Sequence, residues 1–249
     1  MNKMTINNME LNLNLDGSII SIIGPSNSGK TYLLKKLINV INNDDILLDG
    51  EPINEYDSLF LRNNIAVVLD DDIYKSEIVT DELYYYLDKL MYNGYEIALK
   101  IEEFSHLFDI KDILGSRLDL LPIEKKILIK ILSLLIIKPK VFGIDNLLIY
   151  LNNKDRKNII KYIKDNNITL INVTSNSEDL LISDNIVVLS SKKVLVSGSK
   201  ESILEGNSIL PYLGLELPFI TQLSKNLITY DMINKTYYDN RKLVDKIWK

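Results

Sequence analysis

Short apolar runs alternate with longer amphipathic stretches along most of the chain. Short apolar runs are typical of buried strands, and apolar residues spaced three and four apart are typical of helices. Because helices usually connect parallel strands, the alternation predicts an α/β fold with a largely parallel sheet. Seven segments are predicted as strands: Ser18–Ile23, Ile46–Leu48, Ile65–Leu69, Val141–Ile144, Thr169–Thr174, Ile186–Leu189 and Val194–Val196.

The strand pattern stops between Asp70 and Arg117, where two or three amphipathic helices are predicted instead. We therefore expect residues 71–117 to form a helical subdomain. It would be inserted into an α/β core made of residues 1–70 and 118–205.

Two further patterns complete the expected organisation. The pair Asp49-Gly50, between apolar residues, is typical of a tight hairpin turn. Residues 206–249 are predicted to form a short C-terminal extension. In it, Pro211 and Pro218 are expected to break the helical pattern, and a last helix is expected to end at Trp248.

Composition narrows the classes of function. The net charge of −5 gives no general attraction to nucleic acid or anionic lipid, so we expect no nucleic-acid partner. The absence of cysteine excludes disulfides, and a single histidine leaves little for metal ligation. The longest apolar stretch, Ile127–Ile137, is too short to span a bilayer and contains Lys130. We therefore expect no direct membrane span, and any membrane role to come through a partner.

A glycine-rich motif, GPSNSGKT, connects the first predicted strand to a helical pattern. Its glycines allow a tight turn whose amides point at an anion, and the helix adds the positive end of its dipole. This spacing is that of the phosphate-binding loop, in which Lys30 reaches the β- and γ-phosphates and Thr31 ligates Mg²⁺. The expected nucleotide-binding residues are Gly24, Pro25, Ser26, Asn27, Ser28, Gly29, Lys30 and Thr31.

A second motif, KPKVFGIDN, is an apolar strand that ends in Asp145. In phosphate-loop proteins an acid at this place holds Mg²⁺, usually through its water shell. The motif is weak alone, but its distance from the phosphate loop along the chain strengthens it. We therefore expect Thr31 and Asp145 to provide the metal site, with ATP and Mg²⁺ as the ligands.

The order and spacing of these motifs resemble the ATP-binding subunits of ABC transporters. The stretch ILLDGEPINEYDSLFLRNNIAVV is similar to that family's region between phosphate loop and Q-loop. The tail, ILPYLGLELPFITQLSKNL followed by KLVDKIW, resembles the C-terminal segment of energy-coupling factor (ECF) transporter ATPases, which drive micronutrient uptake. The resemblance runs from Leu11 to Trp248. It implies a phosphate-loop NTPase (RecA-like) core of ABC ATPase type.

Several functional positions of that family carry other residues in this chain. The Q-loop glutamine corresponds to Asp70, the signature loop to LPIEK at Leu121–Lys125, and the catalytic glutamate to Asn146. The D-loop aspartate corresponds to Asn152, and the switch histidine to Ser175. The family also has an aromatic residue that stacks on adenine upstream of the phosphate loop, whereas no aromatic residue precedes the motif here.

These replacements imply weak or absent hydrolysis. Neutral Asn146 cannot accept the proton of an attacking water, and loss of a general base costs a factor of about 10² to 10⁴. Ser175 offers no imidazole to the γ-phosphate. In the signature-like loop, Pro122 lacks an amide donor and Ile123 lacks the flexibility of glycine. Glu124 would repel a phosphate by about 4 kcal/mol at roughly 4 Å and an effective dielectric near 20.

The resemblance also implies partners. In ABC ATPases each ATP lies between one subunit's phosphate loop and the other's signature loop, so a homodimer of this chain would have two damaged sites. A heterodimer with a second, intact ABC ATPase subunit is therefore favoured over a homodimer. The pair would dock on an integral membrane transporter subunit, at the inner face of the cell membrane in the cytoplasm. The alternative is a non-transport regulatory or scaffold protein that keeps the fold; a kinase is disfavoured, because no acceptor-binding segment or base stands out.

Three other features have competing interpretations. The run Tyr84–Tyr86 lies where such ATPases receive their membrane partner, but ordinary helix packing is favoured over docking. The acidic run Asp70–Asp72 is close enough in sequence to the Q-loop position to approach Mg²⁺, or forms a solvated loop. His106 is expected to be an ordinary helix residue rather than a catalytic one.

Overall fold

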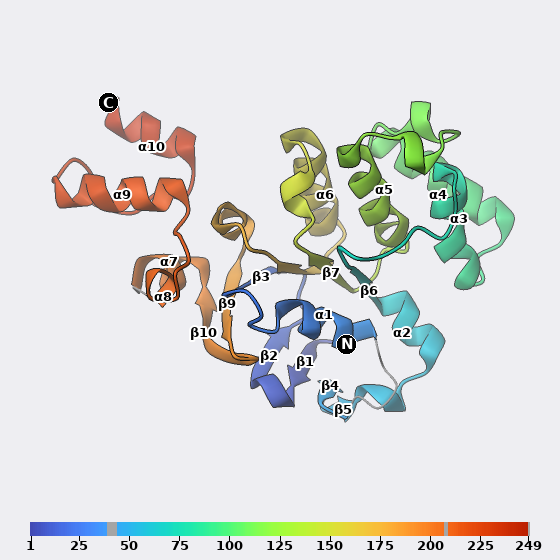
Figure 1. The fold of residues 1–249 in the computed structure, drawn as a ribbon, viewed down its shortest axis with the longest axis horizontal. Helices are drawn as coiled ribbons and strands as arrows, with labels where there is room; N and C mark the ends of the chain where they lie inside the picture. Colours follow the sequence, from blue (N-terminus) through green and yellow to red (C-terminus); the bar gives the residue numbers. More distant parts are fainter. Residues whose placement is uncertain (39–43, 207–208, 249) are drawn as a thin grey trace.

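Two β-sheets enclose the helix that follows the glycine-rich motif (Figure 1). The computed structural model of the protein describes residues 1–38, 44–206 and 209–248. One sheet has six strands in the order β10-β9-β3-β8-β7-β6, and the other has four in the order β2-β1-β4-β5. A layer of helices covers the outer face of the six-stranded sheet.

The six-stranded sheet is parallel except for β10, which runs antiparallel to β9. All seven predicted strands are present, with ends shifted by a few residues at most, so the expected α/β class is confirmed. The strands of this sheet are β3 (Ile19–Ile23), β6 (Ile65–Val68), β7 (Val141–Asp145), β8 (Thr169–Val173), β9 (Asn185–Ser190) and β10 (Lys193–Ser199).

The four-stranded sheet contains strands that the sequence pattern did not indicate. They are β1 (Lys3–Ile6), β2 (Leu11–Asn14) and β5 (Glu51–Pro52), which join the predicted β4 (Ile46–Leu48). The hairpin between β4 and β5 has φ of 52° at Asp49 and 97° at Gly50, which confirms the predicted two-residue turn. The Asp49 carboxylate also accepts hydrogen bonds from the amides of Asn2 and Lys3 and so ties β1 to this turn.

Helix α1 (Lys30–Ile38) lies between the two sheets because its apolar residues face both of them. Leu33, Leu34 and Leu37 are buried. They share a core with Ile20 and Ile22 of β3 and with the inward residues of β1, β2 and β4. This packing fixes the start of α1, and with it the glycine-rich loop, at the carboxyl end of β3.

The segment predicted to be helical contains α3 (Val79–Lys89), α4 (Gly94–Leu107) and a short 3-10 turn at Lys111–Ile113. A capping box between Asn93 and Glu96 defines the start of α4. The segment leaves the core and returns to it at one place, where Ile78 bridges Arg117. Two or three helices were predicted here, and the structure confirms them; the division into subdomains stays a prediction.

A buried carboxylate lies at the start of this helical segment. Glu82 of α3 is 2% exposed and accepts hydrogen bonds from the amides of Lys75 (2.7 Å) and Ser76 (2.9 Å). Burial raises the pKa of Glu82, and these two hydrogen bonds oppose the rise. Its charge therefore holds the turn before α3 in place at an energetic cost.

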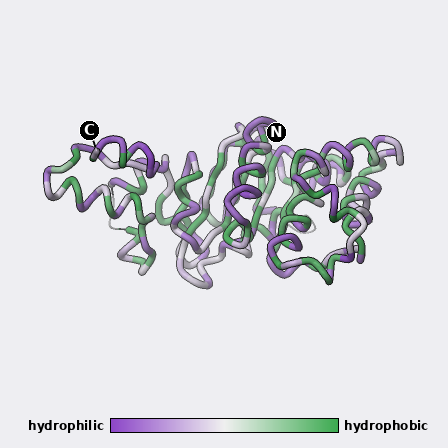
Figure 2. The backbone as a smooth tube through the Cα atoms, turned by 90° about the horizontal axis from the view of Figure 1, so that it is seen from above, coloured by the Kyte–Doolittle hydropathy of each residue, from purple (hydrophilic) through white to green (hydrophobic). Residues whose placement is uncertain are grey.

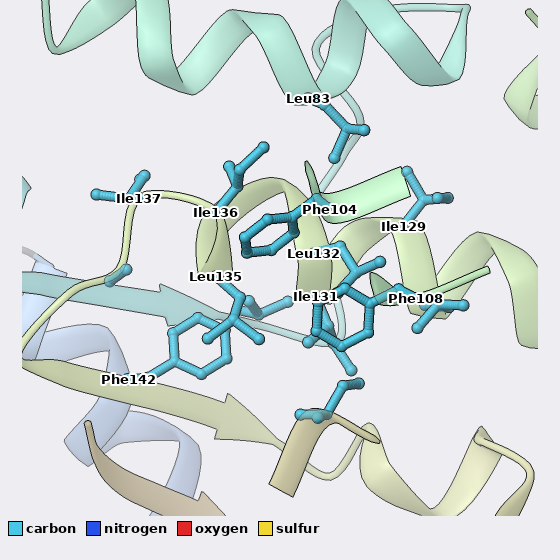
Figure 3. Close-up of a cluster of buried hydrophobic side chains, with 14 of the residues drawn as sticks. Leu83, Phe104, Phe108, Ile129, Ile131, Leu132, Leu135, Ile136, Ile137 and Phe142 are labelled. Carbon is cyan, nitrogen blue, oxygen red and sulfur yellow. The ribbon is translucent and has the colours of Figure 1, made fainter. Parts of the chain in front are cut away.

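Helices α5 (Ile123–Leu135) and α6 (Asn153–Asp165) connect the helical segment to the six-stranded sheet. Figure 3 shows Phe104 and Phe108 beside Leu132 of α5, with Phe142 of β7 below them. Phe104 and Phe108 also contact the ring of Tyr162 on α6, at centroid distances of 5.1 and 5.7 Å. One apolar core thus runs without interruption from α3 to the sheet.

In the described residues, four helices follow β10, at one end of the long axis of the molecule (Figures 1 and 2). Pro211 was expected to break the helical pattern, but it lies within α8, next to Tyr212, the last residue of that helix. Pro218 instead precedes α9, and Trp248 follows α10 and is 85% exposed. These helices are α7 (Lys200–Gly206), α8 (Ile209–Tyr212), α9 (Phe219–Thr229) and α10 (Asn240–Ile247). Residues 207–208 and 249 of the predicted extension lie outside the described residues.

The remaining elements are short. They are α2 (Ser58–Asn64) and the 3-10 turns Asn7–Met9, Ile53–Glu55, Leu118–Leu120, Leu148–Tyr150 and Ser177–Ile182. Across the described ranges, none of the helices is long and apolar enough to cross a bilayer.

Candidate nucleotide-binding site

The loop from Gly24 to Gly29 leaves the carboxyl end of β3 and enters α1 directly. A Cβ atom on Gly24 would lie 2.2 Å from the carbonyl oxygen of Leu189, so only glycine fits against the end of β9. Gly29 has φ of 100°, and Asn27 has φ of 62°. The two glycines therefore provide the tight turn that the motif predicts. Gly24 allows the close approach of β9, and Gly29 adopts a positive φ.

The ammonium of Lys30 points back into this loop. Its Nζ donates to the carbonyl oxygens of Gly24 (2.7 Å) and Pro25 (2.9 Å) and to Ser28 Oγ (3.3 Å). Burial lowers the pKa of Lys30, and the nearby charge of Asp145 opposes that change. The loop therefore holds a half-buried positive charge at the start of α1, which a phosphate group can use as its counter-ion.

Thr31 and Asp145, the expected metal ligands, lie next to each other. Asp145 ends β7 and is 6% exposed, and the Thr31 side chain lies beside its carboxylate. Burial raises the pKa of Asp145, the Thr31 side chain opposes this, and the charges of Asp70 and Asp71 raise it further. A cation at this carboxylate would offset both its burial and the repulsion from Asp70 and Asp71. The oxygen donors of Thr31 and Asp145 therefore fit Mg²⁺.

In the described residues, no group of three or more His, Cys, Asp or Glu side chains is placed to hold a metal ion. Mg²⁺ commonly takes one or two protein oxygens and completes its shell with phosphate and water oxygens. Thr31 and Asp145 therefore fit a cation that arrives with a phosphate ligand. Two side chains of the acidic run have other partners: Asp71 pairs with Lys35 at 2.7 Å, and Asp72 accepts a hydrogen bond from the amide of Leu69.

Asn146 and Ser175, the residues expected to replace a catalytic glutamate and a switch histidine, are hydrogen-bonded to each other. Asn146 Oδ1 accepts from both the amide (3.0 Å) and the hydroxyl (2.8 Å) of Ser175. The backbone N–H of Asn146 donates to the Val173 carbonyl, and the φ angle of Asn146 is 53°. The Asn146–Ser175 contact joins the ends of the neighbouring strands β7 and β8. Both side chains are neutral, and neither is a base at neutral pH.

The loop Leu121–Lys125 forms the start of α5, with Pro122 as its N-cap residue. Glu124 is exposed in the first helical turn. Lys125 forms an ion pair at 3.3 Å with Asp155, which is 4% exposed. Asp155 also accepts from Asn152, the N-cap residue of α6. The segments resembling the signature loop and the D-loop are therefore joined through one buried carboxylate.

Sequence reasoning missed the β9–β10 turn, which lies against the phosphate loop. Ser191 and Lys192 form this two-residue turn with φ of 50° and 64°. The Lys192 amide donates to the Ser28 carbonyl at 2.9 Å. The Lys192 ammonium lies 5.1 Å from the ring centroid of Tyr32. Only the pairing of β9 with β3 brings this turn to the loop.

Comparisons with known proteins agree with this architecture. The family model described as ABC transporter matches residues 6–148. The energy-coupling factor transporter ATP-binding protein EcfA1 of Mycoplasmopsis synoviae is 25% identical, over 98% of this chain and 93% of its own length. The protein of the same name from Ligilactobacillus salivarius is also 25% identical, over 98% of this chain and 89% of its own.

Solved structures give the same fold. The chain cbiO1 from Clostridium perfringens, part of the ABC transporter complex cbiONQ, has a TM-score of 0.70 at 20% identity, covering 89% of this chain and 98% of that one. A dimeric ATP-binding cassette in a post-hydrolysis state with ADP and Pi has a TM-score of 0.68 at 17% identity, covering 80% and 99%. These neighbours confirm the expected ABC ATPase fold. Because the family model covers more than half of its length, the chain belongs to the ABC transporter family.

Proposed function

We propose that the chain is the ATP-binding subunit of an energy-coupling factor transporter for micronutrient uptake, impaired in hydrolysis. The observation that carries the proposal is the contrast within one site. Lys30 lies in the phosphate loop and Thr31 lies beside Asp145, which supports binding of a phosphate chain and its cation, while Asn146 and Ser175 are hydrogen-bonded to each other. The relatives named as energy-coupling factor ATPases, which align over nearly the whole chain, support the transporter class.

Binding and hydrolysis separate because they depend on different residues. The loop amides and Lys30 orient a triphosphate, and Mg²⁺ at Thr31 and Asp145 would neutralise its charge. Activation of water needs a base at the end of β7, where the Asn146 amide group has no basic lone pair. The chain is therefore suited to hold ATP and poorly suited to cleave it.

A second ABC ATPase subunit and a membrane subunit would complete the transporter. Beside an intact partner, the phosphate loop of this chain would meet a functional signature loop. For the membrane subunit, a cavity of about 430 Å³ opens beside the edge strand β6, between α2 and α3. Apolar residues of β6 and α5, such as Val67 and Leu134, line much of it, together with Arg62, Tyr85 and Lys89. A cavity with apolar, aromatic and cationic walls suits an amphipathic segment of a membrane protein, and would place the chain at the inner face of the membrane.

The test is co-purification from its native host, with ATP binding and hydrolysis measured on the same sample. We expect a heterodimer with a second ATPase, bound to a membrane protein. The purified chain alone should bind MgATP, with hydrolysis at least about 10²-fold below that of an ordinary ABC ATPase. Lys30→Ala should abolish binding.

Two results would overturn the proposal. Turnover comparable to an ordinary ABC ATPase in the purified chain, lost in Lys30→Ala, would contradict impaired hydrolysis. A monomer without affinity for ATP would contradict nucleotide binding and favour the scaffold alternative.

A further inference from the structure

Tyr32 is an exposed aromatic residue directly beside the phosphate loop. It follows Thr31 on α1 and is 41% exposed. The ammonium groups of Lys36 and Lys192 lie 5.3 and 5.1 Å from its ring centroid. Lys36 comes from the same helix, whereas Lys192 comes from the β9–β10 turn. An aromatic ring beside two cations at the rim of a phosphate loop has the composition of a nucleoside site.

The strand order indicates which end of a nucleotide would reach this ring. The loop follows β3, with β8 and then β7 on one side and β9 on the other (Figure 1). Asp145 ends β7, so the phosphate with the bound cation lies on that side. The other end of the phosphate chain, which carries the nucleoside, then points toward the β9–β10 turn. Lys192 and Tyr32 lie there.

The contacts of Lys192 show that this position is fixed. Its amide is bonded to the Ser28 carbonyl, and a Cβ atom on Gly29 would lie 3.0 Å from its Cγ. Cation–π contacts at exposed sites are weaker than base–aromatic stacking, so a base can replace an ammonium on the ring. The displaced Lys192 ammonium stays beside the loop, where a phosphate is its nearest possible counter-ion.

We infer that Tyr32 and Lys192 form the nucleoside end of the site: the ring stacks on the base, and the ammonium pairs with the adjoining phosphate. This inference rests on the proposed nucleotide binding. It supplies an aromatic platform from α1 in a chain with no aromatic residue upstream of the loop. Because every base has a π-face, the platform accepts other nucleobases as well, and the site discriminates weakly between ATP and GTP.

The test is calorimetric titration of the purified chain with MgATP and with magnesium tripolyphosphate, which has no base. Tyr32→Ala should weaken ATP binding about 5- to 100-fold, the range expected for loss of one stacked base, and leave tripolyphosphate binding unchanged. Tyr32→Phe keeps the ring and should bind ATP within about twofold of wild type. Lys192→Ala should weaken both ligands, because its charge acts on phosphate.

Tyr84→Ala is the matched control, because Tyr84 is also 41% exposed but lies on α3. It should bind both ligands as wild type does. The inference is overturned if Tyr32→Ala binds ATP as tightly as wild type, or if it loses ATP and tripolyphosphate equally. A wild-type chain that binds neither ligand would overturn the proposed function itself, so the two failures can be told apart.

Discussion

Asn146 and Ser175, which we propose stand in place of a catalytic acid and a histidine, are neutral side chains just beyond the ends of β7 and β8. Their mutual hydrogen bonds make each the other's partner, so neither is left unpaired at the end of its strand. Glu82 shows the opposite arrangement, in which an ionisable side chain is retained although it is buried. Asn146 and Ser175 thus satisfy their hydrogen bonds without charge, whereas Glu82 satisfies its hydrogen bonds as a buried ionisable group.

Glu82 provides a prediction at the residue scale. Because burial raises its pKa above the ordinary 4.5, the folded chain holds this proton more tightly than the unfolded chain. The stability that it contributes is fully present below about pH 4.5 and is lost as the pH rises through the folded-state pKa. Glu82→Gln keeps an oxygen acceptor without the charge, so it should be more stable than wild type at pH 7, with a smaller loss from pH 4 to 8.

Urea denaturation across that pH range measures this effect. Glu82→Ala is the paired variant, because it leaves the amides of Lys75 and Ser76 without their acceptor. It should lose about 2 kcal/mol or more at every pH. A Glu82→Gln variant less stable than wild type at pH 7 would show that the charge itself is needed.

At the scale of elements, Asp155 joins the start of α5 to the start of α6. Lys125→Ala would leave this buried carboxylate without its cation while Asn152 still donates to it. Because the Lys125 side chain is 32% exposed, we expect a loss of about 1–2 kcal/mol in the free energy of unfolding, between the values for a surface pair and a fully buried one. Lys154→Ala is the control, because Lys154 pairs with Asp109 at the surface and should cost less than about 1 kcal/mol. Equal losses in both variants would mean that α5 and α6 are not held together by this pair.

The elements also show what the sequence could predict. Apolar runs such as those of β3 and β8 are buried on both faces, so composition alone identifies them. In β2, LNLN alternates over only four residues, and β1 is as short, so their pattern is weak. The phosphate loop and Asp145 could be predicted because their chemistry follows a local motif. The contacts of Lys192 with Tyr32, and of Asn146 with Ser175, could not, because they depend on which strands become neighbours.

Across the whole molecule, the apolar core is unevenly distributed. One cluster extends from α3 and α4 through α5 to β7 and β8, so the helical segment and the sheet share their buried residues. The last two helices have only a small cluster, in which Ile220, Ile233 and Leu243 are buried. Their stability therefore depends on far less buried apolar surface than that of α5.

Native-state hydrogen exchange should reflect this distribution. We expect amides of α9 and α10 to exchange by local opening, well before those of α5, which should exchange only on global unfolding. Amides of buried positions on α3 and α5 should exchange together, because both helices belong to one core. If α3 exchanged as early as α10, the helical segment would be an independent unit of stability.

The conformation of the β9–β10 turn reduces the stability of the chain. Ser191 and Lys192 both adopt the left-handed conformation, which costs about 1 kcal/mol or more for a residue with a side chain. Glycine adopts it freely, so a chain selected for stability alone would carry glycine at these two places. Retaining lysine beside the phosphate loop gives up some stability for a positive charge, the kind of trade-off found where a side chain is kept for binding. A turn that is distant from the phosphate loop along the chain thus brings a positive charge to that loop, at a cost in backbone conformational energy.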